Sequence, residues 1–390
     1  MRVALFTETF LPSTDGVVTR LLYTLKGFQK EGVEALVLAP DGGPEEYAGA
    51  RVVGFPGTPF YLYPEKRAIW PTSRVTDVLN DFQPDLIHTM NPTVFGIQAI
   101  VSSRLMGVPL VASYHTHFAH YARLYGYGWI TGAIWGYMRL LHNRAALNLC
   151  TSEATRRELE RRGFQRLRVW PHGVDLERFR PRPMDAAMRT MLSGGHPDRP
   201  VLVFVGRLAP EKQIERLIPL LQRMPEVSLA VVGDGPTRPE LERQFHGLPV
   251  VFTGYLQGEE LANAYTSADA FVFPSTTETL GLVLLEAMAS GLPIIAARSA
   301  PSMELLDGGK AGLLYAGDDP ESLVSVVRRF VADPSLRQRL GEASRQQAGA
   351  RGWSKPTADL IGFYHEALGW SSGSPPSHEP MPDGAAYGGR

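Results

Sequence analysis

Short runs of Val, Ile, Leu and Ala recur about a dozen times along the chain, each bounded by Gly, Pro or polar residues. Because polar residues do not alternate within these runs, they are typical of strands buried on both faces, as in parallel sheets covered by helices. The stretches between them have helical spacing, for example Leu21, Leu25 and Phe28. Strand and helix therefore alternate throughout, which predicts an α/β chain with two doubly wound domains. The expected strands are residues 3–6, 35–39, 52–55, 85–89, 109–115, 147–152, 201–206, 228–233, 250–254, 270–274, 293–297 and 312–316.

The domain boundary is visible as a polar, Pro-rich stretch over 175–200 without a strand signal. A new strand then begins at Val201. We therefore expect an N-terminal domain over 1–175, a linker over 176–199 and a second domain over 200–355. A last helix is expected over 356–370, and the Ser-, Pro- and Gly-rich residues 371–390 are expected to be disordered.

The overall charge is close to neutral, with 39 Lys plus Arg against 40 Asp plus Glu. Nucleic-acid-binding proteins usually have a basic excess, so no nucleic-acid partner is expected. The single cysteine, Cys150, cannot form an intramolecular disulfide. Glu8 and Pro12 interrupt any signal-peptide region, and the apolar stretch 128–141 is too short to span a bilayer. These features predict a cytoplasmic protein.

Doubly wound domains bind ligands at the carboxyl ends of their strands, so residues directly after the expected strands are the candidate site. In the second domain Gly206 follows a buried strand, and Arg207 and Lys212 stand before the next helical segment. Two cations beside the free N–H groups of a helix start can bind a diphosphate. The same residues also fit an ordinary solvated loop.

The most specific pattern is PSTTETLGLVLLEAMASGLPIIA over 274–296. Glu278, after a buried strand, can accept hydrogen bonds from sugar hydroxyls, and Glu286 is placed for a diol such as ribose. The alternative is a helix with one capping and one surface Glu, but Glu286 stands on a mostly apolar helix, where an unpaired carboxylate is costly. The helix whose N–H groups would bind phosphate is expected to open at Thr279, Leu280, Gly281, Leu282 and Val283.

Three histidines, His115, His117 and His120, follow the expected strand 109–115. Such a trio can form a metal site, but no carboxylate lies near it in the sequence. The other interpretations are core or loop histidines and a polar catalytic histidine. In the turn-rich loop 10–22, Gly16 allows close approach of a ligand to the backbone, although any loop of this kind needs a turn residue.

Together these motifs resemble glycosyltransferase family 4, the retaining enzymes of GT-B architecture. HGVDLERF (172–179) is similar to the family's interdomain signature, with His172 where Asn is common. SYHTH and YLQGEELANAY (255–265) are similar to the branch containing sulfoquinovosyl-diacylglycerol synthases and GDP-mannose-dependent α-mannosyltransferases. The other segments that carry the resemblance are GRLAPEK (206–212), VVGDGP (231–236), the pair Glu278 and Glu286, and EAMASGLPIIA (286–296).

The resemblance implies two Rossmann-like domains that face a central cleft. The first would bind the acceptor and the second the nucleotide sugar, with the helix 356–370 crossing back to the first. The sequence departs from the family at SAPS (299–302), where many members have a Gly-Gly pair, and at 145–147, which read AAL where relatives have Asp.

For the site residues, the resemblance implies that Arg207 and Lys212 hold the donor diphosphate and that Glu286 holds the ribose. Glu278, with the backbone of 279–283, would hold the transferred sugar and the phosphates. His115 corresponds to the family's active-site histidine and Gly16 to its N-terminal glycine loop.

We therefore expect a retaining hexosyltransferase that needs no metal and no cofactor and takes a UDP- or GDP-linked donor. The alternatives are a nucleotide-sugar epimerase of the same architecture, a metal-dependent hydrolase built on the histidines, a non-catalytic sugar-nucleotide binder, and a transferase with a soluble acceptor. A donor screen with analysis of the products separates these possibilities.

Residues 118–145 favour a lipid acceptor, because aromatic and basic side chains surround an apolar run, as in segments that lie in an anionic membrane surface. This predicts a protein peripheral to the inner face of the cell membrane. The alternative is a buried helix followed by solvated arginines. The side chains concerned are Tyr121, Tyr125, Tyr127, Trp129, Trp135 and Tyr137, with Arg123, Arg139 and Arg144 and the arginines at 156, 157, 161, 162, 166 and 168.

Overall fold

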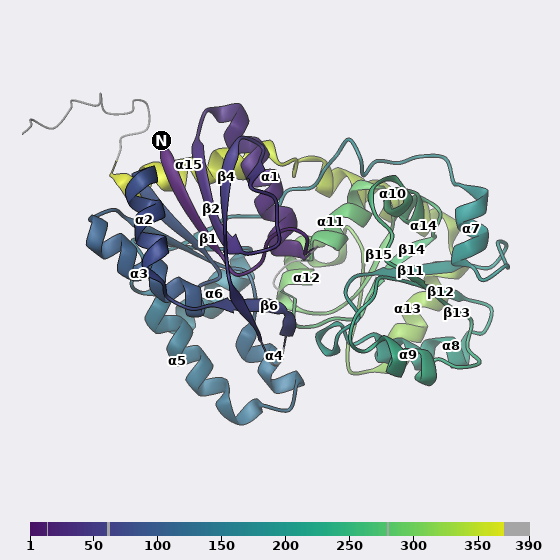
Figure 1. The fold of residues 1–390 in the computed structure, drawn as a ribbon. Coiled ribbons are helices and arrows are strands. Elements are labelled where there is room, and N and C mark those ends of the chain that lie inside the picture. The colour runs from purple at the N-terminus through teal and green to yellow at the C-terminus, as the bar shows by residue number, and fades with distance from the viewer. Residues whose placement is uncertain (14, 61–62, 279–280, 370–390) are drawn as a thin grey trace, which may run out of the picture.

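The computed structural model of the protein describes residues 1–13, 15–60, 63–278 and 281–369. Thr279, Leu280 and the expected tail 371–390 therefore lie outside the described residues. The chain forms two lobes side by side, each built around one β-sheet with helices packed against it (Figure 1). This arrangement confirms the prediction of two doubly wound α/β domains in GT-B architecture.

The N-terminal sheet has eight strands in the order β10-β9-β8-β7-β1-β2-β4-β3. All neighbours are parallel except β3 and β4. Because β1 is central, the loop that leaves its carboxyl end opens at the middle of the sheet edge. The strands are β1 (Arg2–Thr7), β2 (Glu34–Pro40), β3 (Glu46–Tyr47), β4 (Ala50–Phe55), β7 (Leu86–Met90), β8 (Leu110–Tyr114), β9 (Leu147–Cys150) and β10 (Leu167–Val169). The helices are α1 (Gly16–Glu31), α2 (Ser73–Phe82), α3 (Val94–Met106), α4 (Phe118–Leu124), the 3₁₀ turn η1 (Gly128–Ile130), α5 (Thr131–His142) and α6 (Glu153–Arg161).

The C-terminal sheet has six parallel strands in the order β13-β12-β11-β14-β15-β16. Here β11 and β14 are the central pair, so the loops after them lie next to each other. The strands are β11 (Val201–Val205), β12 (Ser228–Val232), β13 (Val250–Gly254), β14 (Ala270–Phe273), β15 (Ile294–Ala297) and β16 (Leu313–Tyr315). The helical elements are η2 (Pro210–Lys212), η3 (Ile214–Leu217), α8 (Ile218–Arg223), α9 (Arg238–Gln244), α10 (Gly258–Thr266), α11 (Leu282–Ala289), α12 (Ala300–Leu305), η4 (Asp307–Gly309), α13 (Pro320–Ala332) and α14 (Pro334–Gly349).

Each sheet is buried on both faces, as the unbroken apolar runs predict. Every residue of β7, β8, β11 and β12 is buried. Along β11, Val203 packs in one apolar cluster and Leu202 and Phe204 in another, on opposite faces of the sheet. This two-sided burial is why the strands lack polar alternation.

Several elements were not predicted, because their patterns are short or polar. The strands β3 and β10 lie at sheet edges, where exposed residues interrupt the apolar run. The antiparallel hairpin of β5 (Gly57–Phe60) and β6 (Tyr63–Ile69) also went unpredicted. Within the expected linker, Asp185 caps the helix α7 (Ala186–Leu192) by accepting from the Met188 N–H.

The last helix, α15 (Ser354–Leu368), packs against the N-terminal lobe beside α1 and is drawn in yellow in Figure 1. Its buried residues Leu360 and Tyr364 join the same apolar cluster as Leu5 and Phe28. Trp170 Nε1 donates to the Pro356 carbonyl at 2.9 Å. The helix α15 thus completes the core of the first lobe.

Candidate active site

The two lobes meet where loops leave the carboxyl ends of their central strands. A Cβ atom placed on Gly16, at the start of α1, would lie 3.6 Å from Leu282 Cδ1, at the start of α11. On the same side, the hydroxyl of Tyr125 donates to the carboxylate of Glu211 at 3.1 Å. These contacts show that the loop after β1 faces the loops of the C-terminal sheet, as the expected cleft requires.

The start of α1 is held by Asp15. Its Oδ1 accepts from the N–H groups of Val17 and Val18, both at 2.9 Å, and its Oδ2 accepts from the Thr9 hydroxyl at 2.9 Å. Capping of this kind fixes the direction in which the chain enters the helix. It therefore places Gly16 against the opposite lobe.

The cations of the loop after β11 lie beside carboxylates. Lys212 Nζ forms an ion pair with Glu278 Oε1, so these two predicted site residues, 66 positions apart, are in contact. Arg207 Nη1 lies 3.9 Å from Oε1 of Glu211, which is buried. Sequence reasoning missed Glu211, although its place between the two cations was a signal that could have found it.

The structure corrects the expected helix after this loop. Residues 210–217 form two 3₁₀ turns, η2 and η3, separated by Gln213 at a φ of 55°, and α8 begins only at Ile218. Arg207 and Lys212 are therefore not at the mouth of an α-helix. The loop is fixed instead by Gln213, whose side-chain oxygen accepts from the backbone N–H and the hydroxyl of Thr276, at 3.1 and 3.0 Å.

The helix expected at 279–283 begins slightly later than predicted. Gly281 is its N-cap and α11 starts at Leu282, so Leu282 and Val283 form its first turn. Thr279 and Leu280 lie outside the described residues. The first N–H groups of α11 thus follow directly on the loop that holds Glu278.

Glu286 is half-buried on α11 and accepts a hydrogen bond from the Tyr265 hydroxyl at 2.9 Å. Burial raises the pKa of this carboxyl to about 7, although the bond from Tyr265 and the charge of Arg178 act in the opposite direction. Nearby, the Tyr23 hydroxyl donates to Asp175 at 2.8 Å. Sequence reasoning did not identify Tyr265, Tyr23 or Asp175, because their proximity to Glu286 depends on the fold.

His115 lies at the end of β8, separate from the other two histidines of its motif. Its Nε2 lies 2.8 Å from the Ser113 hydroxyl, and its ring packs against the edge of Trp170 and near His172. The buried guanidinium of Arg20 stacks on Trp170 at 3.3 Å and contacts His172 Nδ1 at 3.1 Å. Because arginine can only donate, His172 Nδ1 is an acceptor and the proton of this neutral ring is on Nε2.

His117 and His120 come together with Glu158, which the sequence did not predict. Their potential ligand atoms lie within 4.8 Å of one another, and His120 Nε2 is 3.0 Å from Glu158 Oε1. The bond from His120 lowers the pKa of Glu158 to about 2, and burial lowers that of His117 to about 4. Arg162 lies 3.4 Å from the same Glu158 oxygen, and its positive charge opposes a bound cation.

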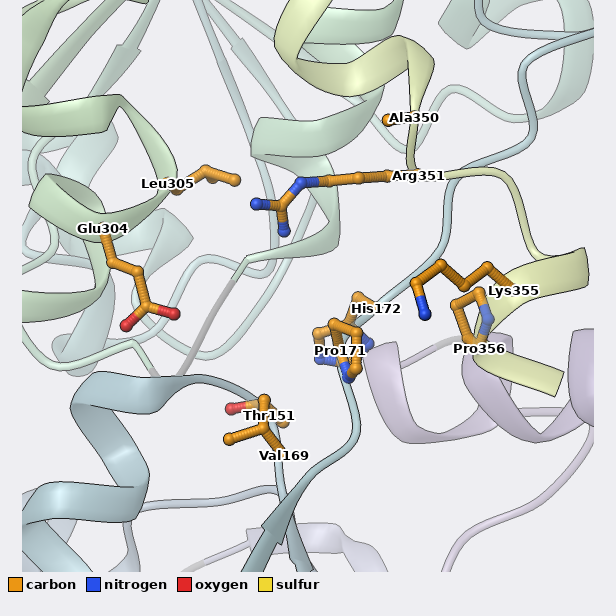
Figure 2. Close-up of a pocket in the computed structure, with 10 residues that line it drawn as sticks. All are labelled: Thr151, Val169, Pro171, His172, Glu304, Leu305, Ala350, Arg351, Lys355 and Pro356. Carbon is orange, nitrogen blue, oxygen red and sulfur yellow. The ribbon is translucent and has the colours of Figure 1, made fainter. Parts of the chain in front are cut away.

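A pocket of about 310 Å³ lies between the lobes, next to the His115–His172 pair. Arg351 extends into it from one side, opposite Pro171 and His172, and Lys355 lies at its edge (Figure 2). Residues of both lobes and of α15 form its wall, namely Thr151, Val169, Pro171, His172, Glu304, Leu305, Ala350, Arg351, Lys355 and Pro356.

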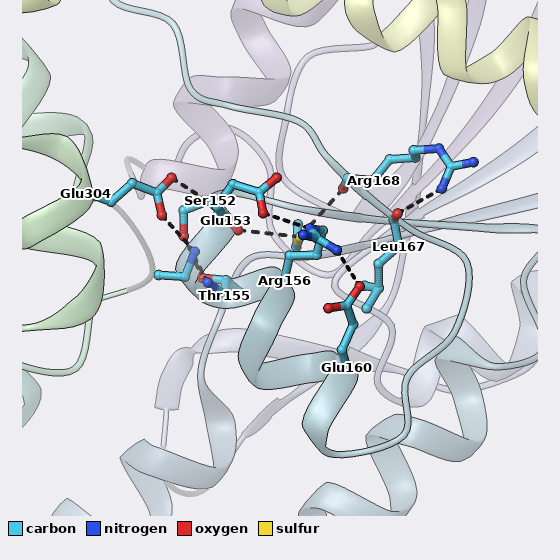
Figure 3. Close-up of polar contacts among 10 residues, drawn as sticks. Ser152, Glu153, Thr155, Arg156, Glu160, Leu167, Arg168 and Glu304 are labelled. Atoms are coloured by element: carbon cyan, nitrogen blue, oxygen red, sulfur yellow. Dashed lines mark hydrogen bonds and ion pairs between the residues drawn. The ribbon is translucent and has the colours of Figure 1, made fainter. Parts of the chain in front are cut away.

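Glu304 joins the two lobes through backbone hydrogen bonds. From α12 it accepts from the N–H groups of Glu153 and Ala154, at 2.9 and 2.7 Å, which are the first of α6 (Figure 3). A carboxylate at a helix N-terminus is favoured by the helix dipole. Arg156 pairs with Glu153 and Glu160 within α6 itself, so that part of the arginine run is neutralised locally.

The sequence matches known families over both lobes. The profile described as Glycosyltransferase Family 4 matches residues 14–178, and that described as Glycosyl transferases group 1 matches residues 193–347. A sulfoquinovosyl transferase of Arabidopsis thaliana is 38% identical over 383 residues, which cover 95% of this chain and 74% of the relative. A GDP-mannose-dependent alpha-mannosyltransferase of Mycolicibacterium smegmatis is 38% identical over 378 residues, covering 95% and 98%. An alpha-monoglucosyldiacylglycerol synthase of Streptococcus pneumoniae is 28% identical over 373 residues, covering 90% and 84%.

The fold is also similar to solved structures. A sucrose-phosphate synthase of Thermosynechococcus elongatus superposes with a TM-score of 0.77, covering 94% of this chain and 99% of that chain. The two sequences are 20% identical, so this similarity concerns the architecture alone.

Proposed function

Since the chain belongs to glycosyltransferase family 4, we propose that it transfers a hexose from a UDP- or GDP-linked donor to a hydroxyl group, with retention at the anomeric carbon. The observation that carries this proposal is that the Lys212–Glu278 ion pair lies on the loops before α11, whose start faces the other lobe, with Glu286 about one turn further along α11. A cation, a sugar-binding carboxylate, helix N–H groups and a half-buried carboxylate are the groups that a nucleotide diphosphate sugar requires.

In this proposal the diphosphate lies against Arg207, Lys212 and the first N–H groups of α11. As the bond between the anomeric carbon and the phosphate oxygen of the donor breaks, negative charge accumulates on the leaving diphosphate, and these fixed donors stabilise it. Glu278 orients both Lys212 and a sugar hydroxyl. Glu286 accepts from the ribose hydroxyls in a half-buried position, where hydrogen bonds of a carboxylate are stronger than in water.

We propose that the acceptor hydroxyl attacks from the face that the diphosphate leaves, with a donor phosphate oxygen removing its proton. Retention then follows without a nucleophile supplied by the protein. The close approach of Gly16 to Leu282 supports a cleft narrow enough to exclude water and align the two substrates. Protein cations and helix N–H groups take the place of a metal ion at the diphosphate.

The acceptor in this proposal is a lipid at a membrane surface, which the diacylglycerol-directed relative supports. Trp135 does not contribute, because it is buried against Tyr114 and beneath Arg162, contrary to the expected interfacial role. Other residues of the expected segment 118–145 are exposed, among them Trp129 at 84%, and α5, within that segment, shares a surface of the required character with α3. None of the helices in the described ranges has the length and apolar content needed to cross a bilayer.

That surface, here called the α3–α5 face, consists of apolar side chains on two neighbouring helices with arginines among them. Leu105 is 76% exposed, and the hydroxyl of Tyr137 on α5 donates to the Thr93 carbonyl at the start of α3, which joins the two helices. Apolar groups beside cations fit an anionic bilayer surface. The residues of the face are Ile97, Val101, Arg104, Leu105, Tyr137, Leu140 and Arg144.

A donor screen tests the proposed function. The protein is incubated with UDP-hexoses or GDP-mannose and with extracted lipids, and the products are identified by mass spectrometry and their anomeric configuration by NMR. The expected product is an α-linked glycolipid from one donor. Products that form without an acceptor would indicate an epimerase, and free sugar would indicate a hydrolase; either would reject the proposal.

A further inference from the structure

A chain of buried polar side chains connects His115 to α15, the last helix within the described residues. His115 Nε2 lies 2.8 Å from Ser113 Oγ, Ser113 Oγ lies 3.0 Å from His88 Nε2, and His88 Nδ1 lies 2.7 Å from the Tyr364 hydroxyl. Ser113, His88 and Tyr364 are fully buried, and His115 is 8% exposed. The members come from β8, β7 and α15, and His88 and Tyr364 are 276 positions apart.

The Tyr364 end fixes the direction of the hydrogen bonds. A buried phenolic O–H needs an acceptor, and within the described part of the chain His88 Nδ1 is the partner of this hydroxyl. His88 must then be neutral with its proton on Nε2. The neutral state of His88 is supported by its pKa, which burial, together with the charge of Arg20, lowers to about 3.

The proton order can be followed to His115. His88 Nε2–H donates to Ser113 Oγ, so the Ser113 hydroxyl donates in turn to another acceptor. Two acceptors are near: His115 Nε2 at 2.8 Å and Met90 Sδ at 3.4 Å. Since an imidazole nitrogen is a much stronger acceptor than a thioether, the hydroxyl donates to His115 Nε2. The proton of neutral His115 is therefore on Nδ1.

We propose that Tyr364, His88 and Ser113 are positioning residues that hold His115 as the Nδ1–H tautomer. The two ring nitrogens point away from each other, so His115 presents a donor, and not an acceptor, on the side opposite Ser113. In the proposed function, which this role presupposes, that N–H donates to an oxygen of the donor sugar. An imidazole that is the other tautomer, or that rotates freely, would present this N–H to the sugar in only a fraction of the protein molecules.

This arrangement also gives α15 a function beyond packing. Tyr364 reaches His88 because Leu360 and Tyr364 are inserted into the core of the first lobe beside Phe28. The helix follows the C-terminal lobe in sequence but contributes to a site of the N-terminal lobe. A small shift of α15 would therefore change the hydrogen bonding of His115 without a change in its own strand.

The tautomer is measured directly by two-bond ¹H–¹⁵N correlation spectra of the ¹⁵N-histidine-labelled protein without substrate. The His115 signals are identified by their loss in His115→Gln. We expect the Nδ1–H pattern in the wild type. In Tyr364→Phe and Ser113→Ala we expect an additional Nε2–H population or averaging between the two. An Nε2–H pattern in the wild type, or unchanged His115 signals in both variants, would overturn the proposal.

Kinetics test the consequence for transfer, with the donor found in the screen. Both variants are expected to lower kcat by about tenfold or more, as loss of a group that orients an imidazole does, with a smaller change in KM. Ser103→Ala and Tyr315→Phe are the matched controls, since each removes a buried hydroxyl that is not part of the hydrogen-bonded series from Tyr364 to His115. Equal losses in variants and controls would show a structural role only. If no donor is turned over, the proposed function fails while the spectra still decide the tautomer.

Discussion

The carboxylate of Glu304, on the C-terminal lobe, accepts a 2.7 Å hydrogen bond from the backbone N–H of Ala154, the second residue of α6 on the N-terminal lobe. Together with the 2.9 Å bond from the Glu153 N–H, it makes Glu304 a cap for a helix of the other lobe. The residue lies just after SAPS (299–302), where the sequence departs from the usual Gly-Gly pair. One of the contacts between the lobes is thus made by a charge and a helix dipole.

Glu304→Ala should favour a more open arrangement of the two lobes. An exposed carboxylate at a helix N-terminus contributes about 0.3–1 kcal/mol, which corresponds to a shift of up to roughly fivefold between closed and open forms. The radius of gyration from small-angle scattering should increase, and kcat/KM should fall by up to about fivefold. Glu321→Ala is the control, because its partner Arg223 belongs to the same lobe. An unchanged scattering curve for Glu304→Ala would contradict this role.

Lys212→Ala and Arg207→Ala should each lower kcat/KM by about two orders of magnitude, because each removes a charge that stabilises the leaving diphosphate, at about 2–4 kcal/mol. Lys212→Ala also leaves Glu278 without its ion-pair partner. The double variant Lys212→Ala/Glu278→Gln should therefore be less impaired than the two single losses multiplied. Lys310→Ala, an exposed lysine on the C-terminal lobe, is the control. Kinetics near the wild type in either single variant would remove that residue from the proposed site.

Nucleotide binding should depend on the protonation of Glu286. Because burial raises its pKa to about 7, the free protein holds this carboxyl protonated below that pH and ionised above it. Ribose hydroxyls donate more strongly to the ionised form, so binding favours loss of the proton. The affinity for UDP or GDP should therefore increase as the pH rises from 6 to 8, by at most about tenfold per pH unit, and level off above 8.

Calorimetry of wild type and Glu286→Gln over the same pH range isolates this effect. Titration of the nucleotide phosphate is common to both proteins and cancels in the ratio of their affinities. Glu286→Gln should bind more weakly at pH 8 and show the flatter profile. Glu278→Gln should retain nucleotide affinity and lose affinity mainly for the intact donor. Parallel pH profiles for wild type and Glu286→Gln would argue against the assigned role of Glu286.

The strands and the principal site residues could be predicted from the sequence because local pattern determines them. Unbroken apolar runs mark strands buried on both faces, and the cost of a lone carboxylate on an apolar helix marks Glu286. The partners of these residues could not be predicted in this way. Tyr265 reaches Glu286 only because α10 packs beside α11, and Tyr364 reaches His88 only because α15 returns to the first lobe.

The expected membrane segment 118–145 also shows what cannot be predicted from composition alone. Alternating aromatic and basic residues have the composition of an interfacial segment, yet Trp135 is 8% exposed with Arg162 over its ring, whereas Trp129 is 84% exposed. Other arginines of the following run pair with nearby acids, as Arg168 does with Glu366. Composition describes which side chains are present, but burial and ion pairing depend on neighbours that are distant in sequence.

Turnover should be insensitive to EDTA and not increase with Mg²⁺ or Mn²⁺, because the proposed diphosphate site uses protein cations. The assay compares initial rates of the purified protein before and after chelation. Loss of activity that is restored by one of these ions would contradict the proposed mechanism. His120→Ala gives a second measurement, since the His117–His120–Glu158 cluster contains the ligand types that could hold an ion. Its response to chelation should match that of the wild type.

Binding to anionic vesicles should depend on the α3–α5 face. Leu105→Glu replaces an exposed apolar side chain with a charge that anionic lipid repels, and should weaken vesicle binding about tenfold or more. Met191→Glu, an exposed apolar residue on the other lobe, is the matched control and should bind as the wild type does. Binding should also weaken as salt increases, because Arg104 and Arg144 act through screened charges. Flotation with vesicles of phosphatidylglycerol and phosphatidylcholine measures each of these effects. Equal binding by Leu105→Glu and Met191→Glu would show that this face is not the contact surface, and transfer to a soluble acceptor at the same rate would reject the lipid acceptor itself.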